Sequence, residues 1–310
     1  MAALRVCLVD ASVYLYRAWF GAPPRHDAAG RPVQALAGFL EFLAELLAAL
    51  RPPLLALAFD AERERSFRRR IAPDYKANRP PAPPELARQF GLAREAAALL
   101  GIALLADPEL EADDLIGSAR EALLPAGIGA DLISSDKDLG QVLEPGDRLW
   151  DFGRRPPLGP EGLRARFGVA PHQLADFLAL CGDRSDNVRG VPGVGPRTAA
   201  ALLRAFGDLE TLCADPSRVA QLPLRGAARL AERLDRHRAE LERARRLTAI
   251  RRDAEVPRLP ARYRPRPTER SSLAAFAREH GLRPETLARV EGALSACAAV
   301  AAPPAAGCGR

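Results

Sequence analysis

The sequence predicts an α/β fold with a parallel central sheet flanked by helices. Short apolar runs of strand length recur along the first half of the chain, and each run ends at or just before acidic residues. The stretches between these runs have the apolar spacing of amphipathic helices. Because strand and helix alternate, we expect the strands to pair in parallel and the helices to cover the sheet.

The expected strands are four apolar runs, at residues 4–9, 54–59, 102–106 and 131–133. Helical periodicity between them covers residues 35–50, 84–100 and 115–124. In a parallel sheet of this kind, functional groups collect at the carboxyl ends of the strands. The four strand ends should therefore line one crevice.

Acidic residues follow all four expected strands. Those residues are Asp10, Asp60, Glu111, Asp113, Asp114, Asp136 and Asp138. Any one of them, taken alone, can be a turn residue or a helix N-cap. Together at one sheet edge they would repel each other strongly unless a cation neutralised them. Ligands that are all oxygen favour Mg²⁺ or Mn²⁺, and two such ions can support hydrolysis of a phosphodiester.

The composition limits the class of protein. With 310 residues, 48% of them hydrophobic, the chain can bury a large core, and we expect one large domain with a smaller companion. The net charge of +6 favours a polyanionic partner such as nucleic acid, although many proteins with this charge have none. No apolar run has the length of a membrane span, and the N-terminus lacks an export signal, so we expect a cytoplasmic protein without membrane contact. The five cysteines form no CxxC pair, and we expect free thiols and no structural zinc.

Lysine is nearly absent from the chain. Only Lys76 and Lys137 occur among the 45 basic residues, which indicates a bias towards arginine. Chance survival of the two lysines is one explanation. A compact ammonium, however, can approach a phosphate as a point charge, whereas a guanidinium needs a different geometry. Lys137 also lies between two of the expected ligands, in Ser-Asp-Lys-Asp, so a role at the acidic edge is the alternative to chance.

The segment between Asp60 and Pro84 combines many cations with two aromatic side chains, Phe67 and Tyr75. Its cations are Arg63, Arg65, Arg68, Arg69, Arg70, Lys76 and Arg79. A charged surface helix is the simpler interpretation. Because the segment joins two strands of the acidic edge, it could instead offset the repulsion of DNA and guide a single strand across that edge. We prefer the second interpretation and include Arg68 among the expected DNA contacts.

A glycine-rich loop with Gly190, Gly193 and Gly195 precedes a helix expected at about residues 197–206. The loop is not a dinucleotide fingerprint, because no strand precedes it and its glycines are in the wrong order. Pro196 suits the first turn of the helix, so the loop N–H groups and the helix N-terminus would face a phosphate. Such a loop binds the backbone of DNA and does not read its bases.

Six segments, in order over residues 4–256, carry a resemblance to a known family. They are LVDASVYLYRAW, FDAERERSFRR, DYKANRPPAPPEL, EADDLIGSA, SSDKDLGQ and DFLALCGDRSDNVRGVPGVGPRTAAALL. The chain resembles the 5′-nuclease domain at the N-terminus of bacterial DNA polymerase I and in related phage and flap nucleases. The resemblance implies a PIN-like 5′-nuclease core, a helical arch at about 61–85, and a helix-two-turn-helix element at the glycine loop.

The resemblance also assigns roles to individual residues. It implies a set of metal ligands made up of Asp10, Asp60, Glu111, Asp113, Asp114, Asp136, Asp138, Asp183 and Asp186. Lys76 and Arg79 fall on catalytic positions beside the scissile phosphate. The implied DNA contacts are Arg17, Tyr75, the three loop glycines and Arg197, although ordinary packing remains an equal alternative for Tyr75 and Tyr14. Arg189 and Pro196 depart from the family pattern, in which a proline and an acidic residue are usual, and this concerns the geometry of the loop.

The expected organisation has three parts: a catalytic domain at 1–175, a helical DNA-binding region at 176–256, and a tail region at 257–310. The tail region should hold a proline-rich linker at 257–270, one or two small helices within 273–294, and a disordered end. No polymerase sequence follows, so we expect a freestanding nuclease.

The expected activity is metal-dependent 5′-3′ exonuclease and 5′-flap endonuclease action on DNA in replication and repair. Two or more Mg²⁺ or Mn²⁺ ions would serve as cofactors, with K⁺ at the helix-two-turn-helix element. Substrates would be 5′ flaps, nicks, branched duplex and RNA–DNA primers, bound by a monomer; the sequence does not identify a partner polymerase or ligase. Two alternatives remain: a catalytically weak structure-specific DNA-binding relative, and a PIN-type ribonuclease.

Overall fold

The computed structural model describes residues 4–301, and its core is a five-stranded parallel sheet with the order β3-β2-β1-β4-β5. The strands are β1 (Arg5–Asp10), β2 (Leu54–Phe59), β3 (Ala103–Ala106), β4 (Gly129–Ile133) and β5 (Arg148–Trp150). Four of them match the expected runs to within two residues. The α/β fold that the sequence predicts is confirmed, with β5 as an additional edge strand.

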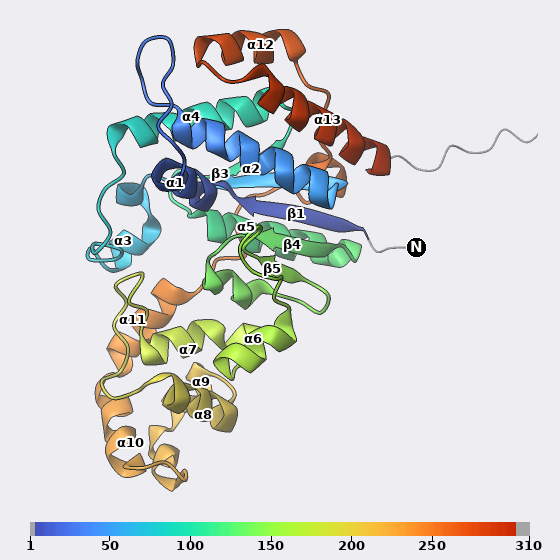
Figure 1. Ribbon diagram of the computed structural model, residues 1–310. Coiled ribbons are helices and arrows are strands. Elements are labelled where there is room, and N and C mark those ends of the chain that lie inside the picture. The colour runs from blue at the N-terminus through green and yellow to red at the C-terminus, as the bar shows by residue number, and fades with distance from the viewer. Residues whose placement is uncertain (1–3, 302–310) are drawn as a thin grey trace, which may run out of the picture.

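Helices cover both faces of the sheet, as Figure 1 shows. On one face lie α1 (Ala11–Gly21), α2 (Gln34–Leu50) and α4 (Pro84–Leu99), and on the other lies α5 (Ala112–Leu123). Along β1, Cys7 and Val9 belong to the core on the α2 side, whereas Val6 and Leu8 belong to the core on the α5 side. This period of two explains why the strand is a continuous apolar run: both of its faces are buried.

A helical region follows the sheet and lies below it in Figure 1. Its helices are α6 (Pro160–Phe167), α7 (Leu174–Cys181), α8 (Pro196–Phe206), α9 (Leu209–Ala214), α10 (Ala227–Arg236) and α11 (Arg238–Thr248). The last of these packs against α7 and against the short helix α3 (Phe67–Ile71), which lies in the segment between β2 and α4. The helical region and this segment are therefore joined by direct contacts.

Short 3₁₀ helices connect these elements. They are η1 (Arg63–Arg65), η2 (Leu124–Ala126), η3 (Lys137–Val142), η4 (Pro171–Gln173), η5 (Pro216–Gln221) and η6 (Pro260–Tyr263). Two of them matter for the site, because η1 begins the basic segment and η3 carries Lys137 and Asp138.

The C-terminal region is packed onto the sheet domain. The expected linker at 257–270 contains Tyr263, which is fully buried and donates its hydroxyl to Pro257 O at 2.8 Å. Helices α12 (Arg270–Glu279) and α13 (Pro284–Ala301) then cover α4 and α2. The helix α13 extends beyond the small helices we expected, into the first residues of the expected disordered end; the remainder of that end, 302–310, lies outside the described residues.

None of the helices within residues 4–301 is long and apolar enough to span a membrane.

Candidate metal centre and nucleic-acid interface

The carboxyl ends of β1, β2 and β4 bring acidic residues together at one edge of the sheet. Asp10 is the last residue of β1 and caps α1, where it accepts a hydrogen bond from Val13 N at 3.1 Å. Its second oxygen accepts from Ser134 Oγ, which follows β4, at 2.8 Å. Asp60 follows β2, and its side chain accepts from Ala112 N at 2.7 Å. These bonds fix two carboxylates from neighbouring strands beside the start of α5.

The N-terminus of α5 adds the carboxylates of Glu111 and Asp113 to this edge. Glu111 Oε1 accepts a hydrogen bond from Ser66 Oγ at 3.2 Å, and Glu111 Oε2 lies 2.5 Å from Lys76 Nζ. Asp113 is in the first turn of α5, where the positive end of a helix stabilises negative charge. We call Asp10, Asp60, Glu111 and Asp113 the first carboxylate group.

A second carboxylate group consists of Asp136, Asp138, Asp183 and Asp186. Asp136 caps η3 by accepting from Asp138 N at 2.9 Å. Lys137 Nζ lies 2.5 Å from Asp183 Oδ2 and 3.0 Å from Asp138 Oδ1. The turn that carries Asp183 and Asp186 follows α7, so the helical region supplies half of this group.

Asp186 links the two groups. Its Oδ2 accepts from Tyr75 Oη at 2.9 Å and lies 3.8 Å from Lys76 Nζ, while its Oδ1 accepts from an Arg79 guanidinium nitrogen at 2.6 Å. Glu111 Oε2 lies 3.3 Å from Tyr75 Oη and so competes with Asp186 for the single hydroxyl proton. The loop from Tyr75 to Arg79 therefore lies between the carboxylates of the sheet edge and those of the helical region.

The pKa values at the site reflect burial and repulsion between carboxylates. Burial, together with the charge of Asp60, raises the pKa of Asp10 to about 7. Burial and the charge of Asp136 raise the pKa of Asp138 to about 7 in the same way. The pKa values of Asp60, Asp113 and Asp186 are also raised, mainly because their carboxyl groups are buried. The pKa values are raised because a buried carboxylate loses the water that would stabilise its negative charge.

The pKa values of two residues, Glu111 and Lys76, are instead shifted in favour of the charged form. Burial alone would raise the pKa of Glu111, but the charges of Lys76 and Arg68 lower it to about 2. Burial alone would lower the pKa of Lys76, but the charges of Glu111 and Asp186 raise it. Lys76 is therefore a charged ammonium held against a charged carboxylate in the middle of the site.

The donor set fits a hard divalent cation in its chemistry. All the side-chain donors are carboxylate oxygens, and repulsion between them is what a divalent ion would relieve. Asp138 Oδ1 is buried and accepts no hydrogen bond, and its contact with Lys137 is an ion pair only. No three acidic, cysteine or histidine side chains within residues 4–301 are arranged closely enough to enclose an ion as they stand. Lys76 and Lys137 lie among the carboxylates and partly neutralise them.

The structure corrects the assignment of Asp114 as a metal ligand. Its side chain is fully buried, and Arg68 donates to both of its oxygens, at 2.6 and 2.8 Å. The backbone N–H groups of Glu111 and Arg251 donate to the same carboxylate. Four donors occupy the acceptor positions of Asp114 and leave no place for an ion. Asp114 is a structural carboxylate that ties α5 to α3 and to the residues after α11.

Arg68 is the partner in this ion pair, and this corrects its expected contact with DNA. Its side chain is 1% exposed, and it also donates to Leu247 O at 2.9 Å and to Ala249 O at 3.0 Å. The guanidinium is thus held inside the protein, where α3 meets α11. In the sequence Arg68 is the first of three consecutive arginines, and nothing in that run shows which one points inward.

Tyr75 is likewise internal. Its side chain is 2% exposed, and its hydroxyl binds Asp186 and Glu111 as described above. Of the two interpretations that the sequence leaves open for Tyr75, packing within the protein is the one observed, and the expected DNA contact is corrected. Tyr14 is also buried, and its ring stacks on Phe42 with centroids 3.7 Å apart.

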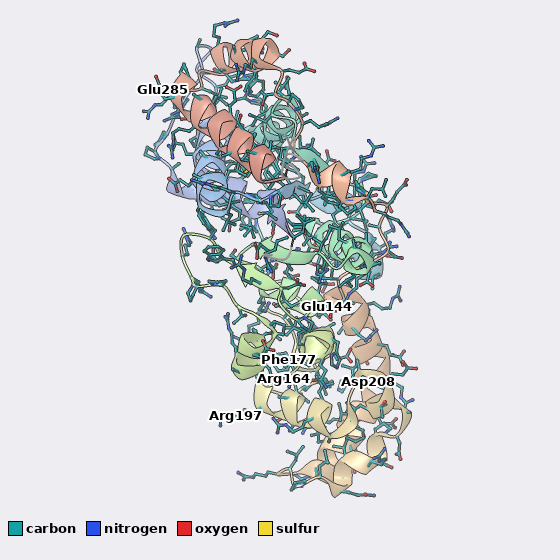
Figure 2. All side chains as sticks on the ribbon, turned by 90° about the vertical axis from the view of Figure 1, so that its right-hand side faces the viewer. Glu144, Arg164, Phe177, Arg197, Asp208 and Glu285 are labelled. Atoms are coloured by element: carbon teal, nitrogen blue, oxygen red, sulfur yellow. The ribbon has the colours of Figure 1, made fainter. Side chains whose placement is uncertain are left out.

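The remaining basic candidates are more accessible. Arg17 lies over the Tyr14 ring and forms an ion pair with Asp151 at 2.6 Å, with about a fifth of its side chain exposed. The side chain of Arg79 is 46% exposed and points towards Asp186. Arg197, in the first turn of α8, is exposed, and Figure 2 shows it at the outer surface of the helical region.

The basic segment that we expected to form an arch consists of η1, α3 and a run of turns before α4. It lies at the left edge of Figure 1, between α4 above and α11 below. Its first part is attached to the sheet domain, since Phe67 N donates to Glu109 O at 3.1 Å. The segment therefore bridges the sheet domain and the helical region, and a short helix makes up its centre.

The three loop glycines differ in what they do. Gly190 packs against the end of α7 so closely that a Cβ would lie 2.3 Å from Gly182 N, so this position requires glycine, and the expected contact of its backbone with DNA stays a prediction. Gly193 has φ of +79°, and a Cβ there would meet Arg233, whose guanidinium donates to Pro192 O at 3.0 Å. Gly195 caps α8 and has no atom within 4 Å of a Cβ position. Gly195 thus leaves free space at the N-terminus of α8, where a phosphate could bind, and we call this space the open seat.

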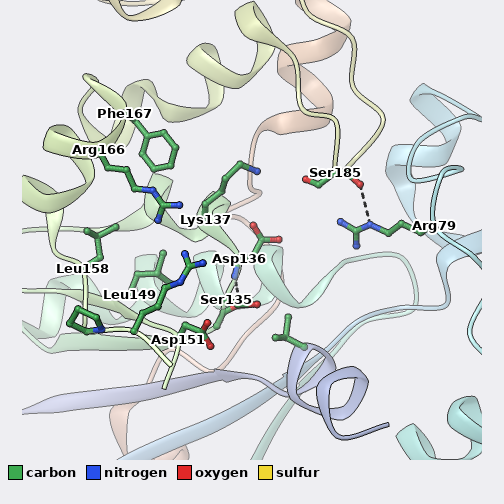
Figure 3. A pocket seen from close by; sticks show the side chains of 14 residues that line it. Arg79, Ser135, Asp136, Lys137, Leu149, Asp151, Leu158, Arg166, Phe167 and Ser185 are labelled. Atoms are coloured by element: carbon green, nitrogen blue, oxygen red, sulfur yellow. Dashed lines mark hydrogen bonds between the residues drawn. The ribbon is translucent and has the colours of Figure 1, made fainter. Parts of the chain in front are cut away.

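Two pockets connect the acidic edge with α8. The first, of about 560 Å³, is lined by Asp136 and by the cations Arg79, Lys137, Arg155 and Arg166, and Figure 3 shows Arg79 and Arg166 approaching Asp136 from different sides. The second, of about 790 Å³, continues from Lys137 and Arg166 to the cations of the helical region: Arg184, Arg197 and Arg204. Sequence reasoning missed Arg155, Arg166, Arg184 and Arg204, because outside a motif nothing separates them from the other arginines.

A parallel sheet with carboxylates at its strand ends, followed by a helical region with a glycine loop, defines a two-part α/β protein with an acidic site where the two parts meet. The chain belongs to the 5′-3′ exonuclease family. Residues 5–168 match the N-terminal resolvase-like domain of 5′-3′ exonucleases, and residues 169–271 match the C-terminal SAM fold of 5′-3′ exonucleases. The family resemblance that the sequence motifs indicate is confirmed.

Relatives of the chain include DNA polymerase I of Pseudomonas aeruginosa, which is 35% identical over 280 residues. That match covers 90% of this chain and 31% of the polymerase, so the chain spans less than a third of that relative. The 5′-3′ exonuclease of Aquifex aeolicus is 37% identical over 205 residues, covering 66% of this chain and 71% of that protein.

Solved structures that share the fold include the T5 D15 protein and the catalytic core of Rad2. The T5 D15 protein co-crystallised with metal ions superimposes with a TM-score of 0.62 at 19% identity, covering 95% of this chain and 99% of that one. The catalytic core of Rad2 in complex with DNA substrate gives a TM-score of 0.61 at 16% identity, covering 94% of this chain and 93% of that one. At this level of identity the likeness concerns the fold.

Proposed function

We propose that this chain is a metal-dependent 5′-3′ exonuclease and 5′-flap endonuclease that hydrolyses phosphodiesters of DNA. The observation that carries the proposal is that the eight carboxylates of the two carboxylate groups lie together, with Lys76 and Lys137 paired to them. Membership of the 5′-3′ exonuclease family supports it. The metal ions of the T5 D15 protein and the DNA substrate of Rad2 are consistent with the same cofactor and substrate class.

The residues that would hold divalent ions are the members of the two carboxylate groups. They are Asp10, Asp60, Glu111, Asp113, Asp136, Asp138, Asp183 and Asp186. Two or more Mg²⁺ or Mn²⁺ ions bound there would supply an activated water and neutralise charge on the leaving oxygen. Asp114 is left out because its oxygens are saturated.

Lys76 and Arg79 contribute fixed positive charge beside these carboxylates. Both contact Asp186, so a phosphate held beside Asp186 would be within reach of an ammonium and a guanidinium. Positive groups that are already in place when charge develops on a phosphate stabilise the transition state without reorganisation. In this proposal Lys76 acts as a point charge and Arg79 as the more exposed, forked donor.

The surface from Lys137 to the start of α8 would hold the DNA backbone. Gly195 and the N-terminus of α8 offer backbone donors, and Arg166, Arg197 and Arg204 line the pocket that leads there. Cations and helix N-termini bind phosphates without reading bases, so the protein would recognise structure in DNA and not sequence. K⁺ at the glycine loop belongs to the same proposal.

The proposed substrates are 5′ flaps, nicks, branched duplex and RNA–DNA primers, processed by a monomer in replication and repair in the cytoplasm. A catalytically weak DNA-binding relative would not need both carboxylate groups. A PIN-type ribonuclease would not need the open seat at α8.

One assay separates these functions. The purified chain is incubated with labelled 5′-flap DNA, nicked duplex or single-stranded RNA, in Mg²⁺, in Mn²⁺ or in EDTA, with Asp136→Asn as the control for contaminating nuclease. The proposal expects metal-dependent cleavage near the flap junction that Asp136→Asn loses. Binding of the flap without cleavage supports the binding relative, and cleavage of RNA alone supports the ribonuclease.

A further inference from the structure

The chain contains only two asparagines, Asn78 and Asn187, and both take part in one contact. Asn78 Nδ2 donates to Arg184 O at 2.9 Å, and Asn187 Nδ2 donates to Asp74 O at 2.7 Å. Each asparagine thus binds a backbone carbonyl of the loop that carries the other one. Because the chain has so few asparagines, the presence of both in one contact indicates that their side chains have a role there.

The two loops carry the residues on which the proposed chemistry depends. One loop, residues 74–79, holds Lys76 and Arg79, and the other, residues 183–188, holds Asp183 and Asp186. Besides the asparagine bonds, Lys76 N donates to Asp186 O at 3.0 Å, and Arg79 Nε donates to Ser185 O at 3.1 Å. The loops are therefore joined by four hydrogen bonds whose acceptors are all main-chain carbonyls.

The backbone conformation shows why such a contact is needed. Lys76 and Asn187 are two of the three non-glycine residues within 4–301 that have positive φ, at 52° and 58°. Asparagine tolerates this left-handed conformation, whereas a lysine adopts it at a cost in free energy. A strained residue persists only where its surroundings hold it, and here the surroundings are the partner loop.

Neither asparagine is bonded to a carboxylate of the site; both of their bonds go to backbone carbonyls. We propose that Asn78 and Asn187 are positioning residues that lock the Lys76 loop onto the Asp183–Asp186 turn and so set the place of the Lys76 ammonium. This inference rests on the proposed function, since it concerns how the catalytic lysine of that function is held. The lock also makes the sheet domain and the helical region meet at one defined spacing in the site.

The first test measures the lock itself, without metal or DNA. Hydrogen–deuterium exchange of peptides covering residues 72–80 is compared between wild type, Asn187→Ala and Asn187→Gly, and Asn78→Ala serves as a second, exposed position. Glycine keeps the left-handed conformation accessible, so Asn187→Gly removes the amide alone. Faster exchange in both Asn187 variants is expected. Wild-type protection in them, or in Asn187→Gly alone, would overturn the lock, because the amide would then hold nothing.

The second test measures what the lock does in cleavage. Asn187→Ala should slow single-turnover flap cleavage between about tenfold and a hundredfold, the effect of a lost hydrogen bond and a misplaced catalytic group. The dissociation constant for the flap in Ca²⁺ should stay within about twofold. Gln173→Ala is the control, because Gln173 Nε2 also donates to backbone carbonyls, those of Gly207 at 2.7 Å and Leu203 at 3.2 Å, and neither belongs to the two loops. The rate of this control should stay within about twofold of wild type.

A double-mutant cycle separates positioning from general damage. If Asn187 acts through Lys76, Asn187→Ala should cost little further rate once Lys76→Ala is present, so the two effects are not additive. Additive losses, or a slow Asn187→Ala variant with unchanged exchange, would overturn the positioning role. If the wild type cleaves no flap, the proposed function fails, and the exchange experiment still decides whether the lock exists.

Discussion

The ammonium of Lys76 lies 2.5 Å from the carboxylate of Glu111, and this ion pair joins the loop after α3 to the first residue before α5. Glu111 is buried and Lys76 is partly buried, and each shifts the pKa of the other towards the charged state. The pair therefore places one fixed positive charge among the carboxylates. In the proposed function this charge is the one that meets the phosphate.

Lys76→Ala should slow single-turnover cleavage of a 5′ flap by roughly a hundredfold or more, the scale of losing an electrostatic contact in the transition state. Lys76→Arg should rescue little of this rate, because a guanidinium has a different shape and hydrogen-bond geometry. Flap affinity measured in Ca²⁺ should change little in either variant. Near-normal cleavage by purified Lys76→Ala would remove the lysine from the catalytic assignment.

Gly195→Asp should weaken binding of DNA across sequences, because a carboxylate at the N-terminus of α8 would occupy the proposed phosphate seat. The position is open and its φ is −94°, so the substitution should leave the fold intact. Gly193→Asp is a poorer test, since its side chain would meet Arg233. Affinity for nicked duplex is measured at fixed salt. Equal affinities of wild type and Gly195→Asp would argue against the loop as a DNA anchor.

The stability of the metal-free protein should fall as the pH rises from about 5 to about 8. Asp10 and Asp138 have pKa values of about 7 when folded, above the ordinary value of an aspartate carboxyl, so the folded state binds more protons than the unfolded state in this range. Glu111, with a lowered pKa of about 2, acts in the opposite sense only at more acidic pH. Melting temperatures in EDTA across this range provide the measurement. A melting temperature that rises with pH would contradict the repulsion between carboxylates.

Arg68→Ala should destabilise the fold by about 3–5 kcal/mol, because it leaves the carboxylate of Asp114 buried without its cation. Stabilisation by Mn²⁺ should persist in this variant, since all eight proposed ligands remain, and the loss of the Arg68 charge, 3.7 Å from Glu111 and 4.0 Å from Asp113, removes a competitor of the ion. Urea unfolding with and without Mn²⁺ measures both effects. A variant of normal stability that binds DNA weakly would restore Arg68 to the DNA interface.

Much of the acidic edge of the sheet could be predicted from the sequence. The strand ends place Asp10 and Asp60 at the sheet edge because apolar runs and the acids after them are local patterns. The three-residue strand β5 was missed, since RLW is too short to show a period. The capping carboxylates start α5 at Ala112, three residues earlier than its apolar pattern indicates.

What the sequence could not show depends on partners from distant parts of the chain. Asp113 and Asp114 are adjacent, yet one faces the site and the other faces Arg68, which comes from another helix. The spacing of two acids cannot reveal which of them meets a buried arginine. The asparagines differ from Asp114 and Arg68, because the sequence itself shows that asparagine is as rare as lysine. Only the structure shows which carbonyls they bind.

The proposed metal centre is tested most directly by the melting temperature of Asp136→Asn in EDTA and over a titration with Mn²⁺, together with cleavage of a 5′ flap. Asparagine can still accept the hydrogen bond from Asp138 N, so the substitution removes charge and keeps the cap of η3. The variant should melt higher than wild type in EDTA, gain less from Mn²⁺, and lose cleavage, because repulsion falls and affinity for the ion falls with it. A variant that melts lower than wild type in EDTA and still cuts flaps would contradict the metal centre.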